Sequence, residues 1–253
     1  MATNSTLQAE ERRARLLASL ERDGAVQLEQ AATDLGVSSM TVRRDLDDLE
    51  AEGLLRRVRG GAVSIAGPRP FSERRVVRSR AKETIAEKAL QLVPRSGAIA
   101  LDASTTAGTI GSSIGTRDGL TVATNSYENF MALRKARGVT AVLVGGEAEE
   151  ETGSFIGSIA VEAASSMLYT RFFTSASAVD SRLGTSEVSL AESQVKRAFA
   201  DRAREVVLLV DSSKLEQQSV ALGFAWSEVA LLVTELDPAD SALDAYRGLV
   251  ELL

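Results

Sequence analysis

Apolar residues recur at intervals of three and four along the start of the chain, which is the spacing of helices with one buried face. The pattern predicts helices over residues 7–22 and 28–35. A third helix begins after Ser38, whose side chain can cap its first turn, and it ends at Gly53. Gly36 separates the second and third helices, so the sequence predicts a helix-turn-helix.

The third predicted helix has two different faces. Val42, Leu46 and Leu49 recur at i, i+4 and i+7 and form its apolar face. Helices that read DNA present their N-terminal residues to base edges, and this end of the helix is polar and cationic. The candidates for DNA contact are Ser38, Ser39, Met40, Thr41, Arg43 and Arg44. The alternative is a solvated helix in which Arg43 and Arg44 pair with acidic residues one turn later.

Two short runs follow this helix on both sides of Gly60-Gly61. Gly-Gly between such runs predicts a two-residue hairpin turn. A basic hairpin beside a helix-turn-helix is a DNA-binding wing, and the alternative is a basic surface hairpin in another fold. The wing residues expected to contact DNA are Arg56, Arg57, Arg59, Gly60 and Gly61.

The order and spacing of these motifs resemble the winged helix of the DeoR family of bacterial transcriptional regulators. The resemblance lies in Val37-Ser38-x-x-Thr41-Val42-Arg43-Arg44-Asp45-Leu46, in Leu49-x-x-x-Gly53 and in Arg59-Gly60-Gly61-Ala62. It implies operator DNA as a partner.

Short apolar runs alternate with helical patterns through the rest of the chain, and their lack of polar alternation predicts a parallel sheet covered on both faces. The predicted strands cover residues 98–101, 120–123, 141–144, 172–174, 206–210 and 229–233, and the predicted helices cover 81–93, 105–114, 127–137, 158–168, 189–203 and the chain from 238. The expected fold class is therefore α/β: a winged helix-turn-helix domain over 1–65, a linker over 66–80 that contains Gly67-Pro68-Arg69-Pro70, and a mostly parallel, doubly wound sheet domain over 81–253.

Polar residues follow several predicted strands, at the edge where open α/β sheets bind ligands. Ser104, Thr105 and Thr106 open a helix, and they offer hydroxyls, free N–H groups and the positive end of the helix dipole to an anion. Each motif alone could be a helix cap or a turn, but their recurrence predicts a pocket. The other residues at these strand ends are Thr124, Asn125 and Ser126, Gly145 and Gly146, which permit close backbone approach, and Lys214, which can supply a cation.

The resemblance to the DeoR family continues through this domain, which in that family is similar in fold to ribose-5-phosphate isomerase and senses phosphorylated sugars or related metabolites. The motifs are Asp102…Thr105-Thr106, Thr124-Asn125-Ser126, Gly145-Gly146, Phe155-x-Gly157, Asp180-x-x-x-Gly184-Thr185, Glu192-x-x-x-Lys196 and Asp211-Ser212-Ser213-Lys214. The effector-site residues that the resemblance implies are Asp102, Thr105, Thr106, Asn125, Gly145, Asp180, Glu192, Lys196 and Lys214. Two positions depart from the family pattern: Ala103 stands where a glycine is usual, and Ser177 where many members carry a charged residue.

Composition narrows the function further. The 253 residues include no cysteine and no histidine, so we expect no thiolate or imidazole metal site, no Ser-His triad and no resident cofactor. The chain shows no secretory signal pattern and no apolar run of about 18 residues, so we expect a cytoplasmic location and no membrane partner. The net charge is −6, yet residues 53–80 hold eight arginines against one acidic residue, and local charge sets the field that a phosphate backbone meets.

The resulting prediction is a ligand-controlled transcription regulator, most simply a repressor of a carbohydrate or polyol catabolic operon, that is not an enzyme. Its expected partners are operator DNA, a small phosphorylated sugar or related anionic metabolite, and further copies of itself in a dimer or tetramer. The alternative is a sugar-phosphate isomerase with an appended DNA-binding domain, in which Glu192 acts as the base beside Lys196 or Lys214.

Overall fold

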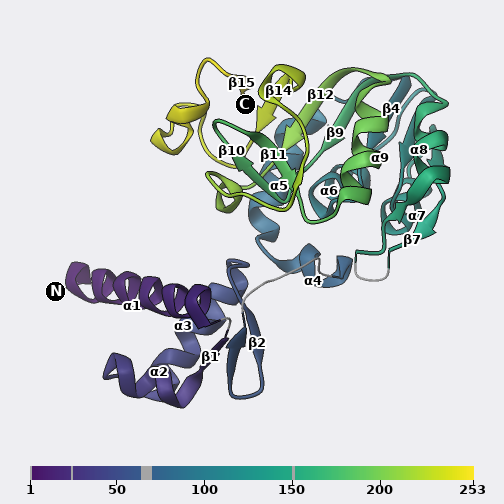
Figure 1. The fold of residues 1–253 in the computed structure, drawn as a ribbon. Coiled ribbons are helices and arrows are strands. Elements are labelled where there is room, and N and C mark those ends of the chain that lie inside the picture. Colours follow the sequence, from purple (N-terminus) through teal and green to yellow (C-terminus); the bar gives the residue numbers. More distant parts are fainter. Residues whose placement is uncertain (1, 24, 64–69, 150–151) are drawn as a thin grey trace. The chain divides into compact units, whose positions relative to one another are not determined.

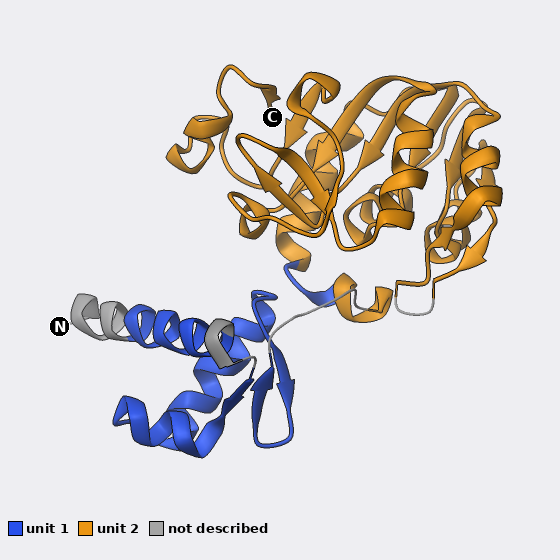
Figure 2. Ribbon diagram, viewed as in Figure 1, with its two compact units in different colours: residues 1–67, 76–78 blue, residues 68–75, 79–253 orange. Residues whose placement is uncertain are grey.

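The computed structural model describes residues 2–23, 25–63, 70–149 and 152–253. Contacts within the chain divide it into two units (Figure 2). Unit 1 comprises Met1–Gly67 and Val76–Arg78, and unit 2 comprises Pro68–Arg75 and Ser79–Leu253. The described part of the expected linker is largely helical, because it holds α4 (Phe71–Val76) and the start of α5 (Ser79–Leu90). Residues 66–69 of that linker, and 64–65 of the predicted wing, lie outside the described residues.

Unit 1 contains the predicted helix-turn-helix and wing. Its described elements are α1 (Ala2–Asp23), β1 (Ala25–Gln27), α2 (Leu28–Leu35), α3 (Ser39–Ala51), β2 (Arg56–Val58) and β3 (Gly61–Val63) (Figure 1). Gly36 ends α2 with a φ of 65°, a left-handed conformation that glycine adopts without steric cost. The apolar face predicted for α3 is buried, and Val42, Leu46 and Leu49 are at most 1% exposed.

The hairpin turn differs by one residue from the prediction. Val58 pairs with Gly61, so the two-residue loop is Arg59-Gly60, and Gly61 belongs to β3. Strand β3 lies between β2 and β1, where Gly61 also pairs with Gln27. A Cβ on Gly61 would lie 2.0 Å from the carbonyl oxygen of Val26. This glycine is therefore required by close strand packing and not by the turn.

Unit 2 alternates strands and helices as predicted. Its described helices are α4 and α5, α6 (Thr105–Ser113), α7 (Tyr127–Leu133), α8 (Gly157–Ser165), α9 (Leu190–Ala200) and the 3-10 turns η1 (Ser212–Lys214), η2 (Trp226–Glu228) and η3 (Ser241–Tyr246). Its described strands are β4 (Gly97–Leu101), β5 (Leu120–Thr124), β6 (Val139–Leu143), β7 (Glu147–Ala148), β8 (Phe155–Ile156), β9 (Tyr169–Thr174), β10 (Ala178–Asp180), β11 (Gly184–Glu187), β12 (Ala203–Leu209), β13 (Ala221–Leu222), β14 (Leu231–Val233) and β15 (Glu251–Leu252).

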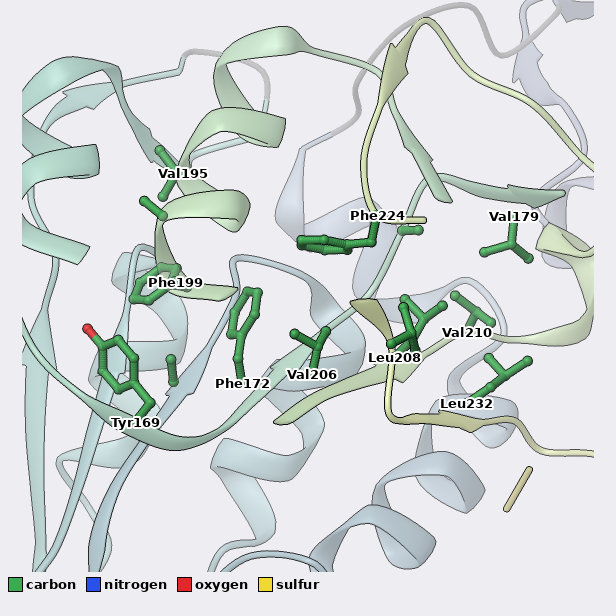
Figure 3. Close-up of a cluster of buried hydrophobic side chains, with 14 of the residues drawn as sticks. Tyr169, Phe172, Val179, Val195, Phe199, Val206, Leu208, Val210, Phe224 and Leu232 are labelled. Carbon is green, nitrogen blue, oxygen red and sulfur yellow. The ribbon is translucent and has the colours of Figure 1, made fainter. Parts of the chain in front are cut away.

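The described strands of unit 2 form a seven-stranded sheet in the order β15-β14-β12-β9-β4-β5-β6. Every pair of neighbours in it is parallel. Alternate residues enter two separate cores: Phe172 packs with α8 and α9 on one face, whereas Phe173 packs with α5, α6 and α7 on the other. In the first core the ring of Phe172 stacks on Phe199 at 5.2 Å (Figure 3). The predicted sheet, covered on both faces, is thus confirmed.

Two parts of unit 2 differ from the prediction. Strands β10, β11 and β13 form a small antiparallel sheet, and β7 pairs with β8, where the sequence predicts no strands. The predicted closing helix is also wrong, because the described chain from 238 forms only the short η3 before β15. Strand β15 joins the edge of the parallel sheet, where Leu252 pairs with Leu232 and packs against the core. Extension of the sheet partly buries this apolar end of the chain.

Candidate DNA-reading face and effector site

The first turn of α3 is held by its own hydroxyl groups. Ser38 Oγ accepts a hydrogen bond from the Thr41 N–H at 3.1 Å and lies 2.9 Å from Thr41 Oγ1. Ser39 Oγ donates to Glu29 Oε2 of α2 at 2.8 Å. These three candidates therefore fix where the helix begins, whereas Met40, which is 58% exposed, extends outward.

Arg43 and Arg44 are exposed and have no ion-pair partner among the described residues. The acidic residues one turn later pair elsewhere: Asp47 Oδ1 lies 3.0 Å from Nε of Arg57, and Asp48 Oδ2 lies 3.7 Å from Nη1 of Arg13. The i, i+4 pairs of the solvated-helix alternative are thus not formed in the described chain. Both arginines remain available to phosphates or base edges.

The wing arginines are not equivalent. Arg57 is half-buried, donates from Nη1 to the Gly61 carbonyl at 3.0 Å and pairs with Asp47 of α3, so it joins the wing to the helix. Its backbone N–H also donates to Glu50 Oε1 at 2.6 Å. Arg56 and Arg59 are exposed. Of the three, these two are free to contact DNA, and Arg57 is committed to the structure of the wing.

Arg12 and Asp45 form an ion pair that the sequence did not predict. Asp45 is 4% exposed and its two oxygens accept from Arg12 of α1, with Nη2 at 2.8 Å from Oδ1 and Nε bonded to Oδ2. The sequence did contain a sign of this ion pair, because Asp45 falls on the apolar face of α3 between Val42 and Leu46. A carboxylate on that face needs a buried cationic partner.

In unit 2, Asp102 is the centre of the candidate effector site. Its carboxylate is fully buried and accepts from the Ser104 N–H at 3.0 Å, from Thr174 Oγ1 at 2.8 Å and from the Ser175 N–H at 2.9 Å. The ammonium of Lys196 lies 3.3 Å from its Oδ2. Burial alone would raise the pKa of Asp102, but the Lys196 charge and these hydrogen bonds outweigh it, so the pKa lies below its ordinary value.

Lys196 is buried between two carboxylates. Its Nζ donates to Glu187 Oε1 at 2.7 Å and to the Ser175 carbonyl at 2.8 Å, in addition to its contact with Asp102. Burial opposes the charged form, but the two carboxylates prevail and raise the pKa of Lys196. Burial raises the pKa of Glu187, which the sequence analysis did not identify. Lys196 therefore acts within the protein and not as a free cation.

Lys214, in η1, bonds to the segment Ser175-Ala176, to which Lys196 also bonds. Its Nζ donates to Ser175 Oγ at 3.0 Å and to the Ala176 carbonyl at 2.6 Å. Burial lowers the pKa of Lys214, since the charged form loses solvation there. These two hydrogen-bond partners are neutral, so neither of them offsets the positive charge that a protonated Lys214 can offer to an anionic ligand.

The end of β5 supplies three more of the expected residues. Thr124 Oγ1 accepts from the Ser126 N–H at 3.2 Å, and Ser126 Oγ caps α7 by accepting from the Asn129 N–H at 3.2 Å. Asn125 is 3% exposed, and its Nδ2 donates to the Phe155 carbonyl at 3.0 Å. Thr124 and Ser126 are thus engaged in local turns, while Asn125 joins β5 to β8.

Glu192 lies on α9 and is bonded to the segment that precedes β8. Ser154 Oγ donates to Glu192 Oε1 at 2.9 Å and lies 2.8 Å from Thr152 Oγ1. Among the described residues Lys196 forms its ion pairs with Asp102 and Glu187, and Lys214 bonds to neutral groups, so neither lysine forms an ion pair with Glu192. The charge of Glu192 still helps to raise the pKa of Lys196.

The two adjacent glycines after β6 have different environments. A Cβ on Gly146 would lie 2.4 Å from the Ile156 carbonyl oxygen and 2.9 Å from the Ala160 Cβ. A Cβ on Gly145 would have no atom of the described protein within 4 Å. Gly146 therefore serves internal packing, and Gly145 is the position where a ligand could approach the backbone.

Asp180 makes no hydrogen bond or ion pair with the Asp102 cluster in the described part of the chain. Its Oδ1 caps the turn between β10 and β11 by accepting from the N–H groups of Arg182 and Leu183, and its Oδ2 accepts from Gln218. These hydrogen bonds, with Gln218 foremost, lower the pKa of Asp180. Its geometry is that of a turn-capping residue.

Both departures from the family pattern are accommodated. Ala103 is 6% exposed, and the described non-glycine residues with a positive φ are Arg78 and Glu216, so its Cβ causes no left-handed strain. Ser177 Oγ donates to Glu187 Oε2 at 3.1 Å. The neutral hydroxyl of Ser177 thus donates to one oxygen of the buried Glu187 carboxylate, while Lys196 donates to the other.

Both parts of the chain match the same protein family. Residues 12–67 match the DeoR-like helix-turn-helix domain, and residues 77–236 match the DeoR C terminal sensor domain. The chain belongs to the DeoR family of bacterial transcriptional regulators. It is 32% identical over 209 residues to the lactose phosphotransferase system repressor of Lactococcus lactis subsp. lactis, covering 80% of this chain and 82% of that protein.

A second relative covers still more of this DeoR-family chain. The glycerol-3-phosphate regulon repressor of Escherichia coli K12 is 26% identical over 226 residues, which is 88% of this chain and 90% of that protein. These relatives are named as repressors, which supports a regulator over the isomerase alternative. Ribose 5 phosphate isomerase A from Neisseria gonorrhoeae aligns with 53% of this chain and 52% of its own at 15% identity and a TM-score of 0.40, too distant to bear on function. None of the described helices is long and apolar enough to cross a membrane.

Proposed function

We propose that this regulator is a cytoplasmic repressor of a carbohydrate or polyol catabolic operon and that a phosphorylated sugar, polyol or related anionic metabolite modulates its operator binding. The observation that carries the DNA-binding part is the exposure of Arg43 and Arg44 on α3, with their acidic neighbours paired elsewhere. A bidentate contact between one arginine and guanine contributes about 1–3 kcal/mol of discrimination against another base. Winged helices of this kind act on paired half-sites, so we propose a homodimer or tetramer.

The effector site that we propose lies at the carboxyl ends of β4, β5 and β12. Ser104 caps α6 by accepting from the Ala107 N–H at 3.0 Å, which leaves the N–H groups of Thr105 and Thr106 without partners in the helix itself. Those groups and the helix dipole favour an anion. Lys214 would add a positive charge, and Gly145 would admit the ligand to the backbone.

We propose that α4 carries the signal away from this site. Arg74 Nη2 donates to the Thr152 carbonyl at 3.1 Å, in the segment whose Ser154 contacts Glu192. The Arg74 carbonyl accepts from Lys82 and lies 3.5 Å from Thr105 Oγ1 at the start of α6. A ligand that displaces the Thr152 segment or the start of α6 therefore acts on α4. The residues at the end of this helix and directly after it, Val76–Arg78, belong to the DNA-binding unit.

The test begins with DNA sites selected from a random library by the full-length protein. Arg44→Ala should weaken binding to the selected site at fixed salt by about tenfold or more, because it removes a base or phosphate contact. Arg204→Ala, which removes an exposed arginine of unit 2, is the control and should change affinity less than twofold. Equal affinity of Arg44→Ala and the wild type would contradict the assigned role.

The effector part is tested with the same DNA. Sugar and polyol phosphates are added singly to the wild-type complex, and at least one should change the dissociation constant for DNA by about tenfold, a coupling free energy of about 1.4 kcal/mol. The same compound should raise the melting temperature of the free protein, because it binds only the native state. A panel with no effect on either quantity would refute the proposed class of effector.

A further inference from the structure

One buried polar atom at the candidate effector site lacks a partner. Asn125 is 3% exposed, and its Oδ1 accepts no hydrogen bond within the described protein. Buried side-chain oxygens in native proteins almost always accept at least one hydrogen bond. An isolated buried acceptor at the ligand-binding edge of a parallel sheet therefore points to a donor supplied by a ligand.

The orientation of the Asn125 amide is set by its neighbour Phe155. The Phe155 N–H donates to the Asn125 carbonyl at 2.8 Å, and Asn125 Nδ2 donates to the Phe155 carbonyl at 3.0 Å. A flipped amide would place its oxygen against that carbonyl oxygen and lose the bond. The nitrogen must therefore face Phe155, and the oxygen must be the free end.

An amide oxygen selects one kind of ligand group. It accepts hydrogen bonds and cannot donate them, so it needs an O–H or N–H donor. A phosphate dianion offers no such donor and would be repelled by the partial negative charge of the oxygen. The groups suited to an anion belong to other residues, namely the N–H groups of Thr105 and Thr106 and the ammonium of Lys214.

We infer that Asn125 is a specificity-determining residue of the effector site, which reads a hydroxyl on the carbon chain of the ligand while the phosphate lies elsewhere in the site. This inference rests on the proposed function and makes it more specific. It requires a hydroxylated phosphate ester, and it predicts that inorganic phosphate binds without help from Asn125. An effector without a hydroxyl would leave the amide oxygen buried and unpaired.

Calorimetric titration of the full-length protein tests this inference. The probes are inorganic phosphate, glycerol 3-phosphate and ribose 5-phosphate. Their counterparts are propyl phosphate, which has no hydroxyl on its carbon chain, and 2-deoxyribose 5-phosphate, which lacks only the 2-hydroxyl. Wild-type protein should bind at least one hydroxylated probe about tenfold more tightly than inorganic phosphate. Asn125→Leu should remove that advantage and change the affinity for inorganic phosphate less than twofold.

Two further variants guard against a general loss of structure. Asn125→Ser leaves space that water can fill and should lose the same advantage if Asn125→Leu does not fold. Tyr169→Phe is the control, because it removes another buried hydrogen bond, which Tyr169 donates to the Ala164 carbonyl. Tyr169 begins β9, whereas Ser175 follows the other end of that strand. This variant should bind every probe as the wild type does. The melting temperature of each variant reports whether it is folded.

The outcomes separate this inference from the function on which it rests. Retention of the hydroxyl advantage in Asn125→Leu or Asn125→Ser would refute the inference alone. So would a wild-type protein that binds inorganic phosphate but gains nothing from any hydroxyl. A wild-type protein that binds none of the probes, inorganic phosphate included, would instead refute the proposed effector class.

Discussion

At the scale of single residues, buried charge in unit 2 is tolerated because each charged group meets several partners. Asp102 accepts from two backbone N–H groups and one hydroxyl, and Lys196 lies between Asp102 and Glu187. Removal of one member of such a network leaves a buried opposite charge with too few partners. This lowers the free energy of unfolding far more than the loss of an exposed ion pair does. These residues therefore hold the loops of the proposed effector site in place, whether or not they contact a ligand.

Asp102→Asn should lower the free energy of unfolding by about 3 kcal/mol at neutral pH, because Lys196 then keeps only one carboxylate partner. Since folding lowers the pKa of Asp102, its stabilising contribution is present above the unfolded-state value of about 3.9 and is lost as the pH falls through the folded-state pKa. The difference between variant and wild type should accordingly shrink in acid. Urea unfolding followed by the fluorescence of Trp226, the single tryptophan, measures it.

The matched control is Asp118→Asn. Asp118 pairs with Arg95 at 3.9 Å, and both side chains are highly exposed. This substitution should change the free energy of unfolding by less than about 0.5 kcal/mol at any pH. An Asp102→Asn variant as stable as Asp118→Asn would show that the buried network contributes nothing.

At the scale of elements, the winged helix depends on contacts between short segments. Strand β3 pairs with both β1 and β2, and Arg57 bonds the hairpin to α3. Three-residue strands are weak by themselves, so the position of the wing relies on these cross-links. The exposed arginines of the wing can contact DNA only while that pairing holds.

Gly61→Ala and Gly60→Ala should therefore behave differently. The new Cβ at position 61 would collide with the Val26 carbonyl and separate β3 from β1, whereas at position 60 it meets no atom within 4 Å and must only tolerate a φ of +89°. Hydrogen exchange should show lost protection over residues 25–27 and 61–63 in Gly61→Ala, with DNA affinity reduced by about tenfold or more. Gly60→Ala should keep that protection at a cost of about 1–2 kcal/mol. Full protection in Gly61→Ala would contradict this role for the glycine.

At the scale of the whole molecule, regulation requires that the ligand and the DNA affect one another through the chain between the two sites. Helix α4 adjoins the DNA-binding unit in the sequence, because its last residue, Val76, belongs to unit 1. Arg74 bonds this helix to the segment before β8. By linkage, any ligand that changes the affinity of the protein for DNA must itself bind with a changed affinity, by the same factor, when DNA is present.

Arg74→Ala should reduce this coupling without abolishing either binding event. The effect of the active sugar phosphate on the DNA dissociation constant should fall from about tenfold to less than about threefold, because α4 loses its bond to Thr152. DNA affinity in the absence of ligand should be nearly unchanged. Arg75→Ala, which changes the adjacent exposed residue of α4, should keep the full effect. Equal coupling in both variants would exclude Arg74 from the route.

Local pattern determined much of this protein. The periodicity of apolar residues placed α2 and α3 almost to the residue, Gly36 marked the turn between them, and the uninterrupted apolar runs predicted the parallel strands. These features depend on neighbours within a few positions in sequence, so they can be read without knowledge of the fold. The hydroxyl and amide residues at the strand ends follow from the same alternation.

The tertiary structure decided which polar groups meet. Glu187 pairs with Lys196, Asp45 pairs with Arg12, and Asp180 caps its own turn, although the motif spacing treats it as a site residue. Gly61 is required because another strand passes beside it. Phe155 fixes the orientation of the Asn125 amide, whose Oδ1 has no partner among the described residues. Each of these depends on atoms brought together from distant parts of the chain, where burial sets the energy of a polar group and sequence spacing carries no information about its partner.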